Sequence, residues 1–255
     1  MEVYCAAVID LHSHILAGLD DGARSIEESL EIARRASEEG ITTIVATPHV
    51  RADYPTTPDE MEAAVDELNA DLELNAIPLR VVAGAEVDGR LLWQIPPVQL
   101  PRFTLAQTGR YLLLETPYRG SPVSLVGGVE RLRQRGITAV LAHPERNPVV
   151  QDRTEAIDPL LRAGALVQVT AASLDGRLGR SVQLAAEKLL DAGTVHVLAT
   201  DAHSPDLRDV ALGAAIDAVG DDELARFLTE DAPAAIVAGR RLPDRPSPAR
   251  LSASV

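Results

Sequence analysis

Histidines and carboxylates recur directly after short apolar runs along this chain. The segment DLHSH at residues 10–14 follows the first run, and TPH at residues 47–49 follows the second. Imidazole and carboxylate groups without cysteine suit Zn, Mn or Fe better than soft-metal ions. The pattern therefore predicts a cluster of two or three divalent metal ions. Eight side chains stand at such positions: His12, His14, His49, Glu86, Glu115, His143, Asp201 and His203.

Three local features refine this prediction. His12 and His14 lie two residues apart, so they leave a strand on the same side and can bind one metal. Asp10 before them is expected to orient an imidazole rather than to bind metal. Glu115 ends the run Tyr-Leu-Leu-Leu, where an unpaired carboxylate is costly to bury. In the turn Asp20-Asp21-Gly22, one carboxylate can reach a metal, although a plain turn explains these residues equally well.

Parallel strands are needed to bring these side chains together. Apolar runs of strand length alternate with amphipathic stretches of helical length, which is typical of βαβ units. Polar residues follow nearly every run, as they do at the C-terminal face of a β/α barrel. We therefore predict an α/β fold with a closed or nearly closed barrel of seven strands, and an open doubly wound sheet is the alternative. The expected strands are Val3–Asp10, Thr42–Ala46, Leu79–Ala83, Tyr111–Glu115, Thr138–Ala142, Leu166–Thr170 and Val195–Thr200.

The helices between these strands carry recognisable ends. Ser25 and Glu28 have the spacing of a capping box before a helix over 27–39, and Thr57-Pro58 opens the next helix. Further helices are expected over 122–134, up to residue 163, over 181–192, near 209–219 and up to residue 238. No linker divides the chain, so residues 1–239 are predicted to form one domain. Residues 240–255 are rich in Arg, Pro and Ser, and they are predicted to be a disordered tail.

Composition excludes some classes of function. The net charge of -14 disfavours binding that depends on neutralising nucleic-acid phosphates. No run of 18 or more apolar residues is present, so no membrane insertion is expected. The N-terminal residues lack the features of a secretory signal. The single cysteine, Cys5, fits a reducing cytoplasm.

Several longer stretches carry a family resemblance over roughly residues 8 to 213. The most specific are IDLHSHILAGLDDGARSIEESLEIARRASEEGITTIVATPH, LAHPERN and LATDAHSPDLR, and VVAGAEV, YLLLETPY and VQVTAASLDGRLGRSVQ support them. The chain resembles the polymerase-and-histidinol-phosphatase (PHP) superfamily. More closely, it is similar to the bacterial manganese-dependent protein-tyrosine phosphatases that are encoded with capsule and exopolysaccharide synthesis.

This resemblance implies a distorted seven-stranded β/α barrel with three metal ions, manganese before iron or zinc. It implies that Glu86 bridges the first two metals and that arginines lie near the substrate phosphate, at Arg146 and Arg208. The partner it implies is a phosphotyrosine protein, a tyrosine autokinase of polysaccharide synthesis. The implied ligands are His12, His14, Glu86 and Asp201 for the first metal, Glu86, Glu115 and His143 for the second, and Asp21, His49 and His203 for the third.

The working hypothesis is hydrolysis of a phosphate monoester by in-line attack of a hydroxide that bridges metals, without a phosphoenzyme. Arg146 would clamp a phosphate oxygen, and a histidine such as His203 or a metal-bound water would assist the leaving group. Cys5 is not expected to be the nucleophile, because Leu11 stands where a cysteine-based site needs an arginine. His196, which precedes the last apolar run, is expected to be structural or exposed.

Four alternatives remain open at this point. A small-molecule phosphatase, acting for example on histidinol phosphate, would use the same metal site. An amidohydrolase also begins with His-x-His, but many need a lysine at a strand end, and the only lysine, Lys188, falls in a predicted helix. A related nuclease is weakened by the acidic charge. A non-catalytic, metal-binding regulator of a kinase would be expected to have lost some of the ligands. The oligomeric state is not predicted.

Overall fold

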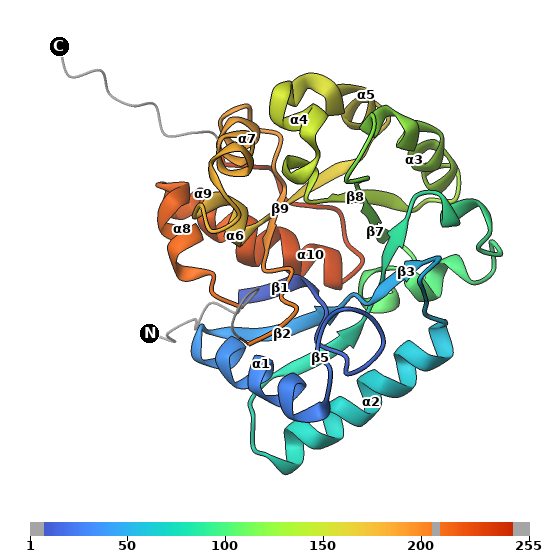
Figure 1. The fold of residues 1–255 in the computed structure, drawn as a ribbon, viewed down its shortest axis with the longest axis vertical. Helices are drawn as coiled ribbons and strands as arrows, with labels where there is room; N and C mark the ends of the chain where they lie inside the picture. Colours follow the sequence, from blue (N-terminus) through green and yellow to red (C-terminus); the bar gives the residue numbers. More distant parts are fainter. Residues whose placement is uncertain (1–7, 206–209, 247–255) are drawn as a thin grey trace.

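The computed structural model describes residues 8–205 and 210–246. In these residues parallel strands alternate with helices, which confirms the predicted α/β class. The helices surround the strands, with α1 and α2 on one side and α3 to α5 on the opposite side (Figure 1). The strands are β1 (Val8–Ser13), β2 (Ile41–Ala46), β3 (His49–Arg51), β4 (Tyr54–Pro55), β5 (Arg80–Ala83), β6 (Glu86–Asp88), β7 (Tyr111–Glu115), β8 (Thr138–Ala142), β9 (Leu166–Thr170) and β10 (Val197–Ala199).

The strands form two hydrogen-bonded sheets. One has the order β1-β2-β5, and the other has the order β10-β9-β8-β7-β6-β3-β4. All of these pairs are parallel except the β3–β4 hairpin. The chain passes from the first sheet to the second twice, from β2 into β3 and from β5 into β6. The segment after β10 also returns to β1, where His14 N donates to Ala202 O at 2.8 Å and Asp201 N donates to His12 O at 2.8 Å.

The helices begin where the sequence places good caps. Ser25 accepts a hydrogen bond from Glu28 N at the start of α1, and Thr57 and Glu60 form a complete capping box at the start of α2. The α-helices are α1 (Ile26–Glu38), α2 (Pro58–Leu74), α3 (Val126–Arg133), α4 (Pro148–Asp152), α5 (Asp158–Arg162), α6 (Ala171–Leu174), α7 (Arg180–Asp191), α8 (Gly213–Val219), α9 (Asp222–Arg226) and α10 (Ala232–Val237). Short 3-10 turns and one π turn (Phe227–Asp231) complete the described helices.

Alternate residues of the strands pack into two separate apolar layers. In β7, Leu112 and Leu114 belong to the larger core cluster beneath the helices, whereas Leu113 belongs to a second cluster. Side chains of β1, β2, β8 and β10 join Leu113 in this second cluster, and Ile236 of α10 completes it. Because successive strand residues point to opposite faces, both faces of the strands are buried.

Several predicted boundaries differ from the structure. The first strand runs three residues beyond Asp10, and the predicted start of that strand, residues 3–7, lies outside the described residues. The strands β3, β4 and β6 were not predicted, because segments of two or three residues carry no readable alternation. The stretch 144–163 is four short helical segments rather than one helix.

Part of the predicted tail is described and lies against the domain. The hydroxyl of Tyr111 donates to Arg240 O at 2.7 Å, and Leu242 packs against both core clusters. Arg245 hydrogen-bonds to Val195 O. Residues 247–255 lie outside the described residues, so a disordered tail stays a prediction there. Within the described residues, none of the helices combines the length and the apolar character that crossing a membrane requires.

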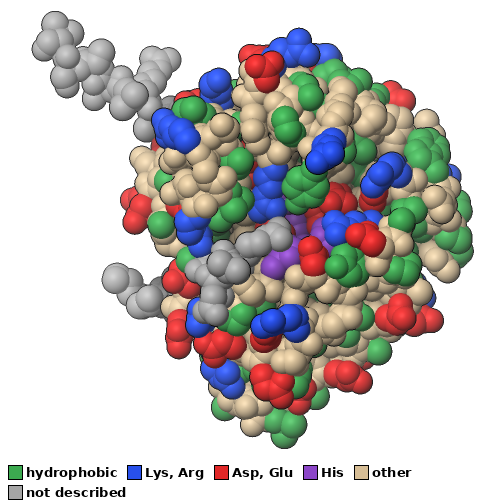
Figure 2. Space-filling model, in the orientation of Figure 1, with side chains coloured by type: hydrophobic (Ala, Val, Ile, Leu, Met, Phe, Trp, Pro, Cys, Tyr) green, Lys and Arg blue, Asp and Glu red, His purple; other side chains and the backbone are tan. Residues whose placement is uncertain are grey.

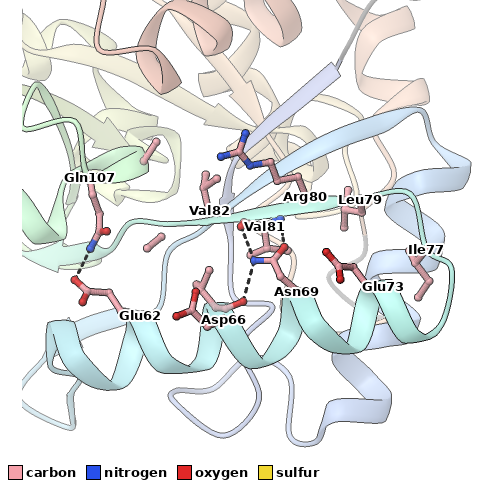
Figure 3. A pocket seen from close by; sticks show the side chains of 13 residues that line it. Glu62, Asp66, Asn69, Glu73, Ile77, Leu79, Arg80, Val81, Val82 and Gln107 are labelled. Carbon is pink, nitrogen blue, oxygen red and sulfur yellow. Dashed lines mark hydrogen bonds between the residues drawn. The ribbon is translucent and has the colours of Figure 1, made fainter.

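The outer edge of β5 is satisfied by a side chain rather than by another strand. Asn69 of α2 accepts a hydrogen bond from Val81 N at 3.0 Å and donates to Val81 O at 2.9 Å (Figure 3). Its amide therefore takes the place of a neighbouring strand at this point. A cavity of about 560 Å³ lies between α2 and β5, and its lining includes acidic side chains of α2 but none of the candidate metal ligands.

We predict that Asn69→Ala lowers the free energy of unfolding by about 1–3 kcal/mol, because Val81 then keeps two backbone groups without a partner. Urea denaturation followed by circular dichroism measures this change. Asn75→Ala is the matched control: its amide donates to Asp71 O on an exposed helix end, and its loss is expected to cost about 0.5 kcal/mol or less. Equal losses in the two variants would contradict the role given to Asn69.

Candidate metal centre

Side chains from six chain segments meet at the C-terminal ends of β1, β2, β5, β7, β8 and β10. His12 belongs to β1, His49 opens β3, Glu86 opens β6 and Glu115 ends β7. The others lie in the segments that follow β1, β8 and β10. The histidines appear at the centre of this face of the molecule, between acidic and basic side chains (Figure 2). Eight of the nine predicted ligands are buried, and Asp21 is the exposed one.

Four donor atoms come together at nearly equal distances. His12 Nε2 lies 3.2 Å from His14 Nε2, 3.4 Å from Glu86 Oε2 and 3.2 Å from Asp201 Oδ1. His14 Nε2 lies 3.5 Å from the same Glu86 oxygen and 3.3 Å from the same Asp201 oxygen. Ligands at 2.0–2.1 Å from a tetrahedral metal are about 3.4 Å apart. These four residues are the predicted first set.

Glu86 stands between two histidines on opposite sides of its carboxylate. Its Oε1 lies 2.9 Å from His143 Nε2, and its Oε2 lies 3.0 Å from His49 Nδ1. Neither Glu86 Oε2 nor His49 Nδ1 has a hydrogen-bond partner of good geometry, although both are buried. Burial acts to raise the pKa of Glu86, but the facing histidines, His12 first, hold it well below its usual range. An anionic carboxylate in this position can bridge two cations.

Asp21 and Asp20 have different positions relative to the histidines. Asp21 Oδ1 lies 3.4 Å from His49 Nε2 and 3.6 Å from His203 Nε2, and these residues form a possible metal-binding group with His14. Asp20 instead binds the other nitrogen of His14, with Oδ2 at 2.6 Å from Nδ1. It also accepts from Gly22 N, and a Cβ at Gly22 would lie 2.1 Å from His14 O. Glycine at residue 22 therefore allows the turn to approach His14 closely, where Asp20 contacts the imidazole.

Glu115 is grouped differently from the set that the family resemblance implies. It forms a possible metal-binding group with His49 and Glu86, whereas His143 is grouped with Glu86 and His12. Arg51 Nη1 lies 3.5 Å from Glu115 Oε1. Burial and the nearby Glu86 raise the pKa of Glu115 to about 7. The carboxyl of Glu115 thus lies beside the cluster, near both His49 and Arg51.

These contacts fit divalent metal ions better than a network of hydrogen bonds alone. Buried oxygen and nitrogen atoms face one another at 3.0–3.5 Å without donor geometry, as around Glu86 Oε2. The pKa of His143 is lowered to about 4 by burial and by the charge of Arg146, so its imidazole is neutral, as a ligand must be. The donor set, nitrogen and oxygen without sulfur, matches Zn, Mn or Fe.

One polar residue that was not predicted, Gln168, contacts two of the histidines. Gln168 of β9 faces His12 Nδ1 with its Oε1 at 3.0 Å and accepts a hydrogen bond from His143 N at 3.3 Å. A glutamine in the apolar run Leu-Val-Gln-Val-Thr was the sequence signal for this role. Asp10 was expected to orient an imidazole, and this is wrong. It accepts from the backbone of His12 and Thr200 and from the Thr200 hydroxyl, and so ties β1 to β10.

Two of the candidate ligands have a left-handed backbone. His143 has φ of 35° and Asp201 has φ of 54°, and neither is a glycine. Such conformations cost about 1–3 kcal/mol each and persist where surrounding contacts fix them. Asp201 is fixed by its backbone bond to His12 O. The left-handed backbone therefore directs the side chains of His143 and Asp201 differently from a regular strand end.

Arg146 is the candidate phosphate-binding residue that lies against the cluster. Its Nη2 is 2.6 Å from Asp201 Oδ2, and its Nη1 is 3.4 Å from the hydroxyl of Tyr118. Its Nε is buried without a hydrogen-bond partner. The ring of Tyr118 stacks on His143 with centroids 5.7 Å apart. Arg208, like Cys5, lies outside the described residues, so its placement beside phosphate stays a prediction.

The remaining histidine and the only lysine lie apart from the cluster. His196 Nδ1 accepts a hydrogen bond from Val167 N at 3.2 Å, which confirms a structural role. Lys188 is exposed on α7. A carbamylated lysine of the amidohydrolase type is therefore not available from this residue.

Fold and cluster together define the class: an α/β protein with a candidate centre for divalent metal ions at the ends of its strands. The family model for capsular polysaccharide synthesis proteins, CpsB/CapC, matches residues 8–236. The chain belongs to this CpsB/CapC family. This confirms the resemblance stated from the sequence.

Curated relatives and solved structures agree with this assignment. Tyrosine-protein phosphatase YwqE of Bacillus subtilis is 34% identical over 230 residues, which are 88% of this chain and 90% of that protein. Putative tyrosine-protein phosphatase CapC of Staphylococcus aureus is 33% identical over 199 residues, 77% of each chain. A crystal structure from work on YwqE and Streptococcus pneumoniae CpsB, described as unique metal-dependent tyrosine phosphatases, matches with a TM-score of 0.81 and 31% identity. It covers 94% of this chain and 99% of that one.

A more distant structure shows likeness of fold alone. The phosphotriesterase homology protein of Escherichia coli matches with a TM-score of 0.57 at 14% identity, covering 91% of this chain and 99% of that one.

We predict that metal binding releases about two protons at pH 7 and strengthens as the pH rises toward 9. Burial acts to lower the pKa of His49, but Asp21 and Glu86 outweigh it and raise the pKa to about 9. The pKa of His14 is raised well above its usual value by Asp20, against the effect of burial. Both imidazoles therefore carry a proton at pH 7 that a metal ion must displace. Calorimetry in buffers of different ionisation enthalpy counts these protons, and metal binding without release would contradict the prediction.

We also predict that Gln168→Ala weakens metal binding about 10- to 100-fold, because His12 and His143 lose the group that fixes both of them. Metal titration of the stripped protein measures the change. Gln134→Ala, on the exposed end of α3, is the control and is expected to bind metal as the unsubstituted protein does. Unchanged affinity in Gln168→Ala would show that the histidines are held by other contacts.

Proposed function

We propose that this protein is a metal-dependent phosphoester hydrolase that removes phosphate from phosphotyrosine in proteins. The observation that carries the proposal is the position of the buried Arg146 guanidinium directly against the cluster, 2.6 Å from the candidate ligand Asp201. A fixed arginine beside metal ligands is suited to hold a phosphate dianion. The names of the relatives support this reading of the substrate.

The proposed metal centre holds three divalent ions, with manganese as the first candidate. The first would be held by His12, His14, Glu86 and Asp201, whose donor atoms lie 3.2–3.5 Å apart. Glu86 and His143 would hold the second, with Glu115 beside them. Asp21, His49 and His203 would hold the third. When bound, such ions supply hydroxide at neutral pH and neutralise phosphate oxygens.

The protein's own side chains bind and orient the substrate in this proposal. Arg146 donates to phosphate oxygens, and Asp201 and Thr170 keep its guanidinium in place. The ring of Tyr118, exposed by 44%, stands over His143 at the mouth of the site and can pack against the aryl ring of the substrate. In this proposal His203 assists the leaving group and Arg208 binds phosphate.

The fold and the composition also support a closed barrel, a single domain and a cytoplasmic location. We infer that the strands close into a distorted seven-stranded barrel of the PHP type, since hydrogen bonds from residues 201–202 return to β1. Residues 1–239 would form the single catalytic domain. A cytoplasmic location fits the single cysteine. The proposed partner is a tyrosine autokinase of polysaccharide synthesis, in keeping with the family.

We predict that phosphate release from a phosphotyrosine peptide is lost when metal is stripped and returns with manganese. His143→Ala is expected to lower the restored activity by more than about 100-fold, because a direct ligand contributes more than its supporting contacts. Arg146→Ala is expected to lower it about 10²- to 10³-fold through loss of charge stabilisation. His196→Asn is the matched histidine control and should keep full activity, since His196 lies apart from the candidate ligands and its Nδ1 accepts from Val167 N.

Histidinol phosphate is assayed in parallel with the peptide. Turnover of this small phosphate without release from the peptide would keep the metal centre and reject the protein substrate. Activity that survives in metal-stripped protein or in His143→Ala would reject the proposed centre.

A further inference from the structure

A second cavity adjoins the metal centre, and apart from Glu115 and Tyr118 its lining has no role in the proposed hydrolysis. It has a volume of about 720 Å³, within the usual range for ligand pockets. Glu115 and Tyr118 belong to its lining, so it opens directly beside the cluster. Its other walls come from the segments that follow β6 and β7. A group bound at the cluster would therefore have its neighbouring atoms within reach of this cavity.

Exposed apolar side chains gather on the same two segments. Trp93, exposed by 58%, and Tyr118 line the cavity, and the exposed Val98 and Val123 lie on the segments that form it. These are four of the six large apolar side chains that are exposed in the described residues. One face of Trp93 is covered by Arg131, whose Cζ is 4.9 Å from the ring centroid. Exposed aromatic side chains that line a cavity, here Trp93 and Tyr118, are typical of a binding site.

Among the described residues that line the cavity, one arginine, Arg119, has no carboxylate within ion-pair distance. Asp88 is paired with Arg90, with Oδ2 and Nη2 2.6 Å apart, and Glu115 faces Arg51. Arg119 is exposed, and no carboxylate of the described residues lies within ion-pair distance of it. In a protein with a net charge of -14, an arginine available at the mouth of a site for anions favours a negatively charged occupant.

We propose that this cavity binds the residues that flank phosphotyrosine in a protein substrate, with an acidic side chain on Arg119 and an apolar stretch of the peptide against Trp93. The inference rests on the proposed function and adds a preference for acidic sequence next to the phosphorylated tyrosine. A peptide fits the shape of the site, because one part of it occupies the metal centre while the adjacent residues enter the cavity. A small phosphate ester has no atoms to place there.

The sole tryptophan of the chain allows a direct measurement of this contact. Two product peptides without tryptophan are titrated into the metal-loaded protein, one with Asp or Glu beside an unphosphorylated tyrosine and one with Asn or Gln instead. The emission of Trp93 is expected to change with the acidic peptide, and Arg119→Glu is expected to weaken this binding about tenfold. Arg133→Glu is the matched control, an exposed arginine of α3 that does not line the cavity.

Hydrolysis of three substrates separates this inference from the proposed function. The phosphorylated acidic peptide should exceed its neutral counterpart in kcat/KM by about tenfold. Arg119→Glu should remove that preference while p-nitrophenyl phosphate is cleaved at the original rate. Equal kcat/KM for the two peptides, or a preference that survives in Arg119→Glu, would reject the cavity as the subsite. Metal-loaded protein that cleaves none of the three would reject the proposed function itself.

A membrane surface is the competing occupant for exposed apolar and basic side chains. A shift of Trp93 emission with anionic phospholipid vesicles, together with no response to the acidic peptide, would overturn the peptide subsite in favour of lipid binding.

Discussion

The structure depends on how buried carboxylates, Glu86 and Asp201 above all, are held close to one another around the histidines. Glu86, Asp201 and the histidines around them are buried, and their donor atoms approach to 3.0–3.5 Å. Without compensation, carboxylates at such positions repel one another and lose their hydration. In the protein alone, protons on His14 and His49 supply part of the balance, as their raised pKa values show. Divalent cations would supply the remaining positive charge.

The scaffold has two kinds of contact that hold these ligands in place. Gln168 and Asp20 fix imidazole nitrogens that do not face the cluster, so that the opposite nitrogens point inward. Asp10 and the backbone bonds between His12 and Asp201 tie β1 to the end of β10, which are nearly 190 residues apart in sequence. The cost of the left-handed backbone at His143 and Asp201 is offset by these long-range contacts. Loss of a supporting contact would therefore affect several ligands at once.

In the proposed function, the loops that line the adjoining cavity select the substrate, and the metal centre does not. Tyr118 and Arg146 connect the two regions, since Tyr118 stacks on His143, hydrogen-bonds with Arg146 and lines the adjoining cavity. The cluster is suited to a phosphate group in general, whereas Trp93 and Arg119 can distinguish what the phosphate is attached to. In this arrangement the chemistry and the choice of protein substrate rest on different segments of the chain.

The sequence by itself determined the α/β class, the main strands and the identity of the residues that gather at their ends, because strand periodicity and polar residues after apolar runs are local signals. It also determined the family, through LAHPERN and the other stretches. Only the tertiary structure showed that Asp20 contacts His14 while Asp21 faces His49 and His203, and it placed Glu115 near His49 and Gln168 beside His12. It corrected the role of Asp10 and revealed the short strands β3, β4 and β6. These features depend on contacts between segments far apart in the chain and on backbone angles that no local pattern encodes.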